Sequence, residues 1–539
     1  MSVRRWWGAL SFSLFAALGT WSAAAAEADE HGPASWLNQP VVTLTGLFGG
    51  SEDGADEAAE NDATGAGESE PPPSGDVISG AAFSGGDAAG GKKPGPACDA
   101  KKMKALKKAA ATAYKDPFFE NDFNYLCDPC YDDWHLGEDL KRNCLGDWGV
   151  WDIGGQFRLR YENQHNFRGG TGGITGTDDQ FLLYRTRLYA DVHVQDYFRV
   201  YAEMLDAVIT NENFRPRLID ENRTQIQNLF GDLRLYDGDC GDAWARVGRQ
   251  EMLYGVQRLV SPLDWANTRR TFEGYKGFWK GEDWDVDGFF VRPVIPDVGG
   301  FDGPDQSREF AGVYSTYKGR KDEKIDLYWL HLNETAGAGF EFETFGGRWA
   351  GKHDDWLWDH EAAVQPGSAG GNDAVGGMFT FGLGRQFDCV PWDPKFFVYY
   401  DWASGNATTG GFNDLFPLTH YWLGFMDLYA RRNITDFNLQ LTLSPSEKLQ
   451  LLVWYHMFNL QNSDLGPFNG TNLPYNPGNT PGSAILGNEL DVMLTWKCTP
   501  RSNIQLSYSR FWAGAYYQTT PGAVDADADF VYTQFLVNF

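Results

Sequence analysis

The stretch GQFRLRYEN, residues 155–163, alternates charged and apolar side chains with a period of two. Arg158, Arg160 and Glu162 fall on one side of the alternation, and large apolar or aromatic residues fall on the other. This period is that of a β-strand, whose successive side chains point to opposite faces. A soluble sheet could turn the apolar face to a core and the charged face to water, so the alternation alone leaves the class of protein open.

Later segments repeat the pattern. FLLYRTRLYADV, residues 181–192, places Arg185 and Arg187 on one face, and Arg234 shares a face with Tyr236 farther along the chain. In a membrane barrel alternate residues face lipid and lumen, and an arginine that faces lipid at mid-depth costs about 2 to 4 kcal/mol. If these strands span a membrane, their arginines must face the inside of the barrel.

Residues 150–539 consist of short alternating segments separated by turns. Tight turns such as Gln195-Asp196 alternate with long insertions, as in outer-membrane barrels, and an even number of strands would leave no open edge. We expect about eighteen strands, at 152–162, 180–194, 197–208, 224–236, 243–254, 271–280, 283–292, 309–319, 323–333, 341–351, 356–365, 374–387, 395–403, 432–444, 448–459, 487–498, 503–513 and 528–539.

The two ends of the chain favour a bacterial outer membrane. Residues 1–26 have a basic start, an apolar stretch and small residues at the end, which is typical of a secretory signal peptide. The final stretch, DFVYTQFLVNF, alternates and ends on Phe539, which resembles the C-terminal signal of outer-membrane barrels. Aromatic residues make up 15% of the chain, as two interfacial girdles would require. We therefore predict an all-β protein, a single-chain transmembrane antiparallel β-barrel at residues 150–539.

A region of different composition precedes the predicted barrel. Residues 27–97 are rich in Gly, Ala, Ser, Pro and acids, so we expect a disordered acidic linker that carries much of the net charge of -28. Residues 98–149 are expected to hold a short helix near 99–114 and a connector that bears cysteines. This part could bind a periplasmic or cell-wall partner.

The cysteines of an exported protein meet an oxidising compartment. We expect a structural disulfide among Cys98, Cys127, Cys130 and Cys144, and the odd total of 7 leaves at least one cysteine free or intermolecular. A zinc site is the alternative interpretation, with less support because no histidine cluster completes it.

The lumen of the predicted barrel would carry the chemistry. Eighteen strands enclose a space too wide for their own side chains to fill, which leaves a water channel. A guanidinium can donate two parallel hydrogen bonds to a carboxylate, so an arginine-lined wall would attract a passing polyanion. The alternative interpretation is that these arginines form ion pairs with neighbouring acids, brace the wall and select nothing.

Two stretches resemble a known family. VGRQEMLYGVQRLVSPLDWANTRRTFEG, residues 247–274, and FNDLFPLTHYWLGFMDL, residues 412–428, are similar to segments of the alginate export family of outer-membrane barrels. The resemblance implies an eighteen-stranded barrel that passes an anionic uronic-acid polymer through an arginine-lined constriction. Within the matched motifs it marks Arg249, Arg258, Arg269 and Arg270 as candidates. The linker, helix and cysteine-bearing connector depart from the family pattern.

The predicted function is passive export or diffusion of an anionic, alginate-like polysaccharide through the outer membrane. The alternatives are a porin for small anions or carbohydrates and a plugged structural or adhesin barrel. We expect no catalysis, cofactor or metal, and contact with outer-membrane lipid but not nucleic acid, because neither a nucleophile motif nor a concentrated basic face occurs. The predicted pore-lining residues are Arg158, Arg160, Arg185, Arg187, Arg234, Arg249, Arg258, Arg269 and Arg270.

Overall fold

A computed structural model describes residues 98–539, except 168–172, 471 and 477. The predicted signal peptide, residues 1–26, and the predicted acidic linker, residues 27–97, lie outside the described residues. Within the described part of the chain, no helix is long and apolar enough to cross a membrane.

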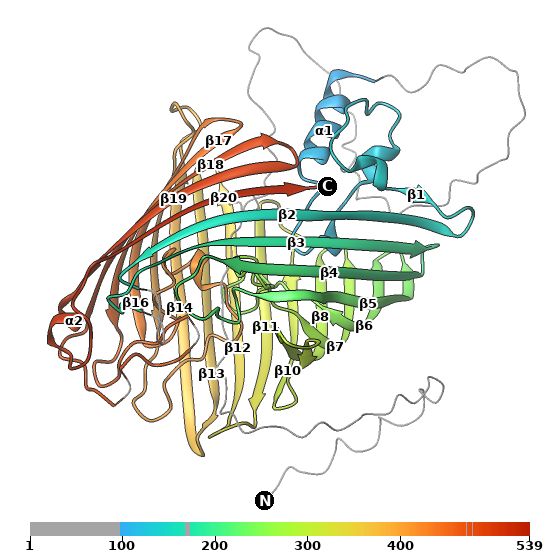
Figure 1. The fold of residues 1–539 in the computed structure, drawn as a ribbon. Helices are drawn as coiled ribbons and strands as arrows, with labels where there is room; N and C mark the ends of the chain where they lie inside the picture. The colour runs from blue at the N-terminus through green and yellow to red at the C-terminus, as the bar shows by residue number, and fades with distance from the viewer. Residues whose placement is uncertain (1–97, 168–172, 471, 477) are drawn as a thin grey trace, which may run out of the picture. The chain divides into compact units, whose positions relative to one another are not determined.

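Antiparallel strands close into one barrel (Figure 1). The sheet contains twenty strands, of which β1 and β9 have two residues each and the other eighteen form the wall. Each wall strand pairs with its neighbours in sequence, and β20 pairs with β2 to close the barrel. Closure satisfies the backbone groups that an open edge would expose. The predicted fold class, with its eighteen strands, is confirmed.

The strands are β1 (Asn143–Cys144), β2 (Gly149–His165), β3 (Asp179–Val194), β4 (Phe198–Thr210), β5 (Asn222–Gly238), β6 (Gly241–Gln250), β7 (Phe272–Gly281), β8 (Trp284–Ile295), β9 (Gly303–Pro304), β10 (Arg308–Tyr317), β11 (Glu323–Glu334), β12 (Phe340–His353), β13 (Trp356–Ala369), β14 (Asn372–Gln386), β15 (Lys395–Ala403), β16 (Ile434–Ser446), β17 (Leu449–Leu460), β18 (Ile485–Thr499), β19 (Ser502–Ala513) and β20 (Ala528–Asn538). The helices are α1 (Ala100–Ala111), η2 (Phe118–Glu120), η3 (Asn124–Cys127), η4 (Glu138–Leu140), η5 (Thr419–Tyr421) and α2 (Ala515–Thr519).

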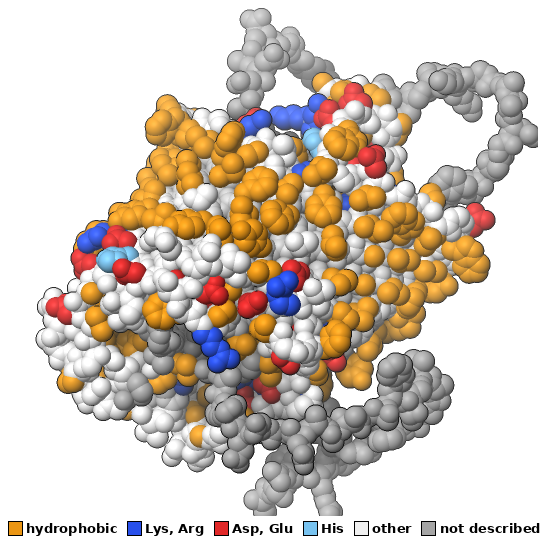
Figure 2. Space-filling model, in the orientation of Figure 1, with side chains coloured by type: hydrophobic (Ala, Val, Ile, Leu, Met, Phe, Trp, Pro, Cys, Tyr) orange, Lys and Arg blue, Asp and Glu red, His pale blue; other side chains and the backbone are white. Residues whose placement is uncertain are grey.

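The two faces of the wall alternate as the sequence predicts. In β3, Arg185 and Arg187 are at most 1% exposed, whereas Leu188 is 49% exposed. Figure 2 shows hydrophobic side chains gathered over the outer face of the strands on the side in view. Burying charge inside and presenting apolar side chains outside is the arrangement that a lipid environment requires.

Most strand ends differ from the predicted ends by a few residues, and two differences in β5 and β6 concern predicted lumen positions. The segment expected to continue as strand to residue 254 leaves the wall at Gln250, because the chain turns into the barrel there. Tyr236 was expected on the lumen face with Arg234, but it is 55% exposed. The pairing of β5 with β6 shifts register between Arg234 and Tyr236, and such a bulge reverses the side on which the following residues point.

The connector before the barrel lies at the end with the short turns. Its helix α1 begins after Asp99, whose side chain accepts from the Lys102 N–H. A disulfide joins Cys98 to Cys130, which confirms that a bridge forms among the four cysteines considered. Cys127 and Cys144 are free. The connector is therefore closed on itself by one covalent link.

Candidate functional site

Two long loops fold into the barrel. The first inward loop (residues 251–271) joins β6 to β7, and the second inward loop (residues 404–433) joins β15 to β16. Most of their residues are buried. The Ser261 N–H donates to the carbonyl of Phe416 and the Phe416 N–H donates to that of Leu259, each over 2.9 Å. The two loops therefore form one connected unit inside the lumen.

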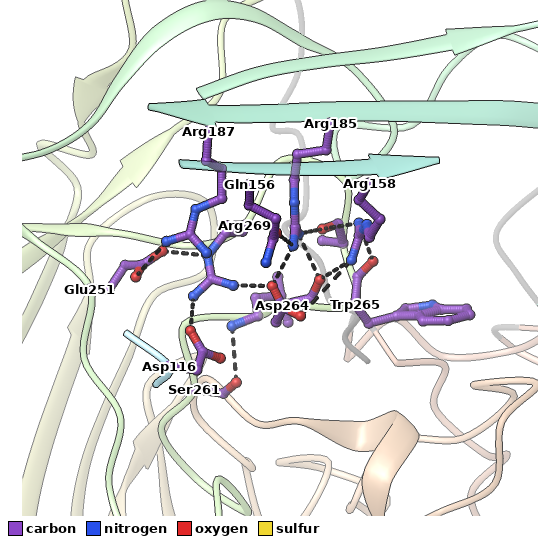
Figure 3. A network of polar contacts seen from close by, with 12 residues as sticks. Asp116, Gln156, Arg158, Arg185, Arg187, Glu251, Ser261, Asp264, Trp265 and Arg269 are labelled. Atoms are coloured by element: carbon purple, nitrogen blue, oxygen red, sulfur yellow. Dashed lines mark hydrogen bonds and ion pairs between the residues drawn. The ribbon is translucent and has the colours of Figure 1, made fainter. Parts of the chain in front are cut away.

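Arginines of β2 and β3 hold the first inward loop by its backbone (Figure 3). Arg158 Nη1 donates to the carbonyl of Asp264 over 2.6 Å. Its Nη2 donates to the carbonyls of Trp265 and Ala266, each over 3.1 Å. Arg185 Nη1 donates to the carbonyl of Asp264 over 2.8 Å. Buried carbonyls without donors would destabilise the loop, so these arginines supply the missing partners.

The carboxylate of Asp264 lies among three guanidiniums. Arg185 Nη2 donates to Oδ1 over 2.6 Å, Arg269 Nη1 donates to the same oxygen, and Arg158 Nη1 is 4.0 Å from Oδ2. Burial alone would raise the pKa of Asp264, but Arg185, Arg269 and Arg158 together lower that pKa below its usual value. The carboxylate is thus a fixed negative charge at the centre of the arginine cluster.

Arg269 joins three parts of the chain. Its guanidinium bonds to Glu251 at the start of the same loop and to Asp116 of the N-terminal connector. Arg187 of β3 donates from Nε to Glu203 over 2.5 Å and lies 3.6 Å from Glu251. The four arginines predicted on β2 and β3 are each at most 2% exposed and face inward: Arg158, Arg160, Arg185 and Arg187.

Arg160 completes the β2 contact through an aromatic ring. Its guanidinium lies 3.6 Å from the ring centre of Trp265, and its Nε is 2.8 Å from the carboxylate of Glu162. Trp265 stacks on His420 of the second inward loop at 4.0 Å between ring centres. Burial lowers the pKa of His420 well below its usual value, so this imidazole is neutral and stacks as an aromatic ring.

Arg258 fixes the first inward loop to a different part of the wall. Its guanidinium donates to Asp359 over 2.6 Å and to Glu361 over 2.9 Å, both on β13. It also lies 3.8 Å from the ring centre of Trp422. Since the same loop bonds to β2 and β3 through Asp264, it crosses the lumen between walls of the barrel.

The remaining strand arginines are placed differently. Arg234 lies near the short turn between β5 and β6 and pairs with Asp242 at 2.6 Å. Arg249 shares the outward face of Val247, which is 50% exposed, and pairs with Glu273 at 3.0 Å. The structure therefore differs from the expectation at Arg249: the alternation in β6 points it away from the lumen.

Sequence reasoning missed several lumen arginines, among them Arg246, Arg348 and Arg431. Arg246 of β6 donates to both carboxylate oxygens of Asp232, over 2.7 and 2.8 Å. The alternation within β6 could have identified it, since Arg246 lies between the apolar residues Ala245 and Val247. Arg431 of the second inward loop bonds to Asp401 of β15. No local pattern marks Arg431, because its partner is thirty residues away on a strand.

A cavity lies between the first inward loop, the start of β10 and the second inward loop. It contains about 660 Å³ of empty space, part of it open to solvent. Its charged lining consists of three guanidiniums and one carboxylate, and burial lowers the pKa of Arg270 to about 9, so this guanidinium still carries charge at neutral pH. The lining residues are Leu218, Ile219, Leu263, Thr268, Arg269, Arg270, Pro293, Val294, Ile295, Pro296, Asp305, Arg308, Leu415, Phe416 and Asn472.

The sequence profile of the alginate export family matches residues 150–530, which is most of the chain and nearly all of the barrel. The chain belongs to the alginate export family. This membership and the closed eighteen-strand barrel identify an outer-membrane channel. A comparison of the sequence with curated proteins found no match.

Solved structures resemble this member of the alginate export family in fold. OpdO of Pseudomonas aeruginosa is 13% identical with a TM-score of 0.50, over 72% of this chain and 97% of that one. OccAB4 of Acinetobacter baumannii is 10% identical with a TM-score of 0.49, over 73% of this chain and 100% of that one. At sequence identities this low, the similarity concerns the fold of the barrel and not its function.

Proposed function

We propose that this alginate export family member lets an anionic polysaccharide diffuse passively through the outer membrane, and that the cavity beside Arg270 and Arg308 binds the carboxylates of the polymer. The observation that carries the proposal is the cavity lining, which places Arg270 and Arg308 beside one lining carboxylate, Asp305. Arg308 is also paired with Glu334 at 2.5 Å, and the guanidinium of Arg269 is bonded to carboxylates outside the lining. A planar guanidinium matches a carboxylate in shape and charge. No catalytic step is part of this proposal.

The arginines divide into two groups in the proposed channel. Those of β2 and β3, such as Arg158 and Arg185, are wholly buried and bonded to the first inward loop, so their part is to position that loop. Arg270 and Arg308 line the cavity and remain within reach of a solute. Selectivity would then arise at the cavity, and the braced wall would set its shape. Export across the inner membrane would depend on the signal peptide predicted at residues 1–26.

The test is the current through the refolded full-length protein in a planar bilayer. We measure the reversal potential in a salt gradient and the block by added polyuronate, for the unaltered chain and for Arg270→Gln with Arg308→Gln. Arg320→Gln is the matched control, because that arginine lies in the exposed turn between β10 and β11 and its side chain is 60% exposed.

The proposal expects anion selectivity and polyuronate block in the unaltered protein and in the control. Both should weaken in the double variant, since two positive charges leave the cavity. Anion selectivity without polyuronate block would favour a porin for small anions. Cation selectivity, or a double variant that behaves as the control does, would refute the cavity as the binding site.

A further inference from the structure

A segment of the connector enters the barrel from the end with the short turns. This plug segment (residues 113–123) follows α1 and includes η2. Phe118 and Phe119 are only 4% and 6% exposed. They pack in one apolar cluster with Tyr189 of β3, Tyr201 of β4 and Phe230 of β5. These three aromatic residues are themselves at most 3% exposed and alternate with outward residues, so the cluster lies on the lumen face.

The contacts of the plug segment are specific in geometry. The ring of Phe119 meets those of Tyr201 and Phe230 edge to face, with ring centres 5.8 and 5.2 Å apart. Arg187 lies 3.8 Å from the ring centre of Phe118, and Arg246 lies 4.5 Å from that of Phe119. Two lumen arginines therefore stack on aromatic rings that the connector supplies.

Polar contacts hold the backbone of the plug segment in place. Arg199 of β4 donates from Nη2 to the carbonyl of Phe119 over 2.6 Å, and the same guanidinium is paired with Asp191 at 2.7 Å. Asn121 donates to the hydroxyl of Tyr189 over 3.4 Å. The segment is thus bonded to the inner wall through side chains and main chain together.

The plug segment also reaches the loops that enter from the opposite end. Asp116 accepts from Arg269 of the first inward loop, the residue that also binds Glu251 (Figure 3). The first inward loop joins β6 to β7 at the end of the barrel with the long loops. The Asp116–Arg269 pair therefore links this loop to the plug segment, which enters from the opposite end. A solute moving through this part of the lumen would meet the plug segment.

The rest of the connector is attached at the rim. Arg501, in the turn between β18 and β19, donates to the Ala110 carbonyl over 2.5 Å and to Glu138 over 2.8 Å. Lys141 donates to the carbonyls of Ile153 and Phe539 over 2.5 and 3.2 Å. These anchors lie on both sides of the plug segment in sequence, so the segment could leave the lumen while the connector stays attached.

We propose that the plug segment closes the channel at its short-turn end and that conduction requires its withdrawal from the aromatic cluster of β3, β4 and β5. The inference rests on the proposed function only in assuming a conducting path. It does not depend on what the path selects. It assigns a gating role to a connector that departs from the family pattern.

The experiment compares single-channel currents of the full-length protein with those of the Phe118→Ser, Phe119→Ser variant in plain potassium chloride. Trp134→Ser is the matched control, since this aromatic residue belongs to the same connector but is 62% exposed. We expect the open probability of the double variant to rise at least about tenfold. Truncating a buried phenylalanine costs more free energy than a tenfold change in the equilibrium between docked and released plug requires. The control should behave as the unaltered protein does.

Amide hydrogen exchange of residues 113–123 verifies that the double variant has released the segment, and Phe119→Ala is a milder variant should the double change prevent folding. Faster exchange with an unchanged open probability would overturn the proposal, because the barrier would then lie elsewhere. The open probability in plain salt is independent of ion selectivity and polyuronate block. Failure of the plug is therefore distinguishable from failure of the proposed function.

Discussion

Replacing Asp264 by Asn should destabilise the docking of the first inward loop. The change removes the carboxylate that Arg185 contacts at 2.6 Å and Arg158 approaches at 4.0 Å, while the carbonyl of residue 264 still accepts from both. Two unit charges 4 Å apart interact by about 4 kcal/mol at an effective dielectric constant of about 20. Removing one partner of a buried ion pair typically costs about 3 to 5 kcal/mol. Because the carbonyl bonds remain, we expect a loss near the lower figure.

The measurement is urea unfolding of the refolded protein in lipid vesicles. The matched control is Asp355→Asn, which breaks the pair with Arg385 at 3.1 Å, where both side chains are nearly half exposed. Exposed pairs of this kind contribute about 0 to 1 kcal/mol. Asp264→Asn should therefore lower the free energy of unfolding by about 3 kcal/mol and the control by less than about 1 kcal/mol. Equal losses in the two variants would refute the view that Asp264 anchors the loop.

Two further predictions concern the plug and the wall. Burial raises the pKa of Asp116 from 3.8 to about 6, against the opposing effect of Arg269, so the docked plug binds a proton more readily than the free segment does. Docking should strengthen as pH falls through about 6, so single-channel open probability should be roughly tenfold lower at about pH 5, one unit below the docked pKa, than at about pH 7.5. Asp116→Asn should remove the difference, and the opposite trend would contradict this sign. Leu188→Arg places a charge on the lipid face of β3 and should lower the free energy of unfolding in vesicles by about 2 to 4 kcal/mol, whereas Leu188→Ala should cost less, and equal effects would argue against lipid contact there.

The wall of the barrel was predictable because its signal is local. Alternation with a period of two is imposed by strand geometry, and the cost of arginine in lipid then fixes the face of Arg158 and Arg185 without knowledge of their partners. The same reasoning fails where the period is interrupted. Tyr236 follows a bulge, which changes the face on which it points. Arg249 follows Gly248, which has no side chain to show whether that position faces the lumen or the lipid.

The interior of the barrel was not predictable in the same way. The bridge between Val260 and Phe416 joins residues of two loops that are far apart in sequence, and nothing in either loop alone specifies the other. The plug segment is a similar case. Phe118 and Phe119 are two apolar residues in a short connector, and only the folded chain brings them to the aromatic cluster of the wall.

The residues that carry the family resemblance act mainly on loop placement. In the DWAN motif, Asp264 binds guanidiniums, Trp265 stacks on His420, and Asn267 Nδ2 lies within 3.1 Å of the carbonyls of Tyr184, Val208 and Asp220. Each side chain joins the first inward loop to another part of the barrel. A shared motif of this kind specifies where the loop crosses the lumen. Under the proposed function, what passes the loop depends instead on the guanidiniums that line the cavity, so a shared architecture does not by itself specify a shared substrate.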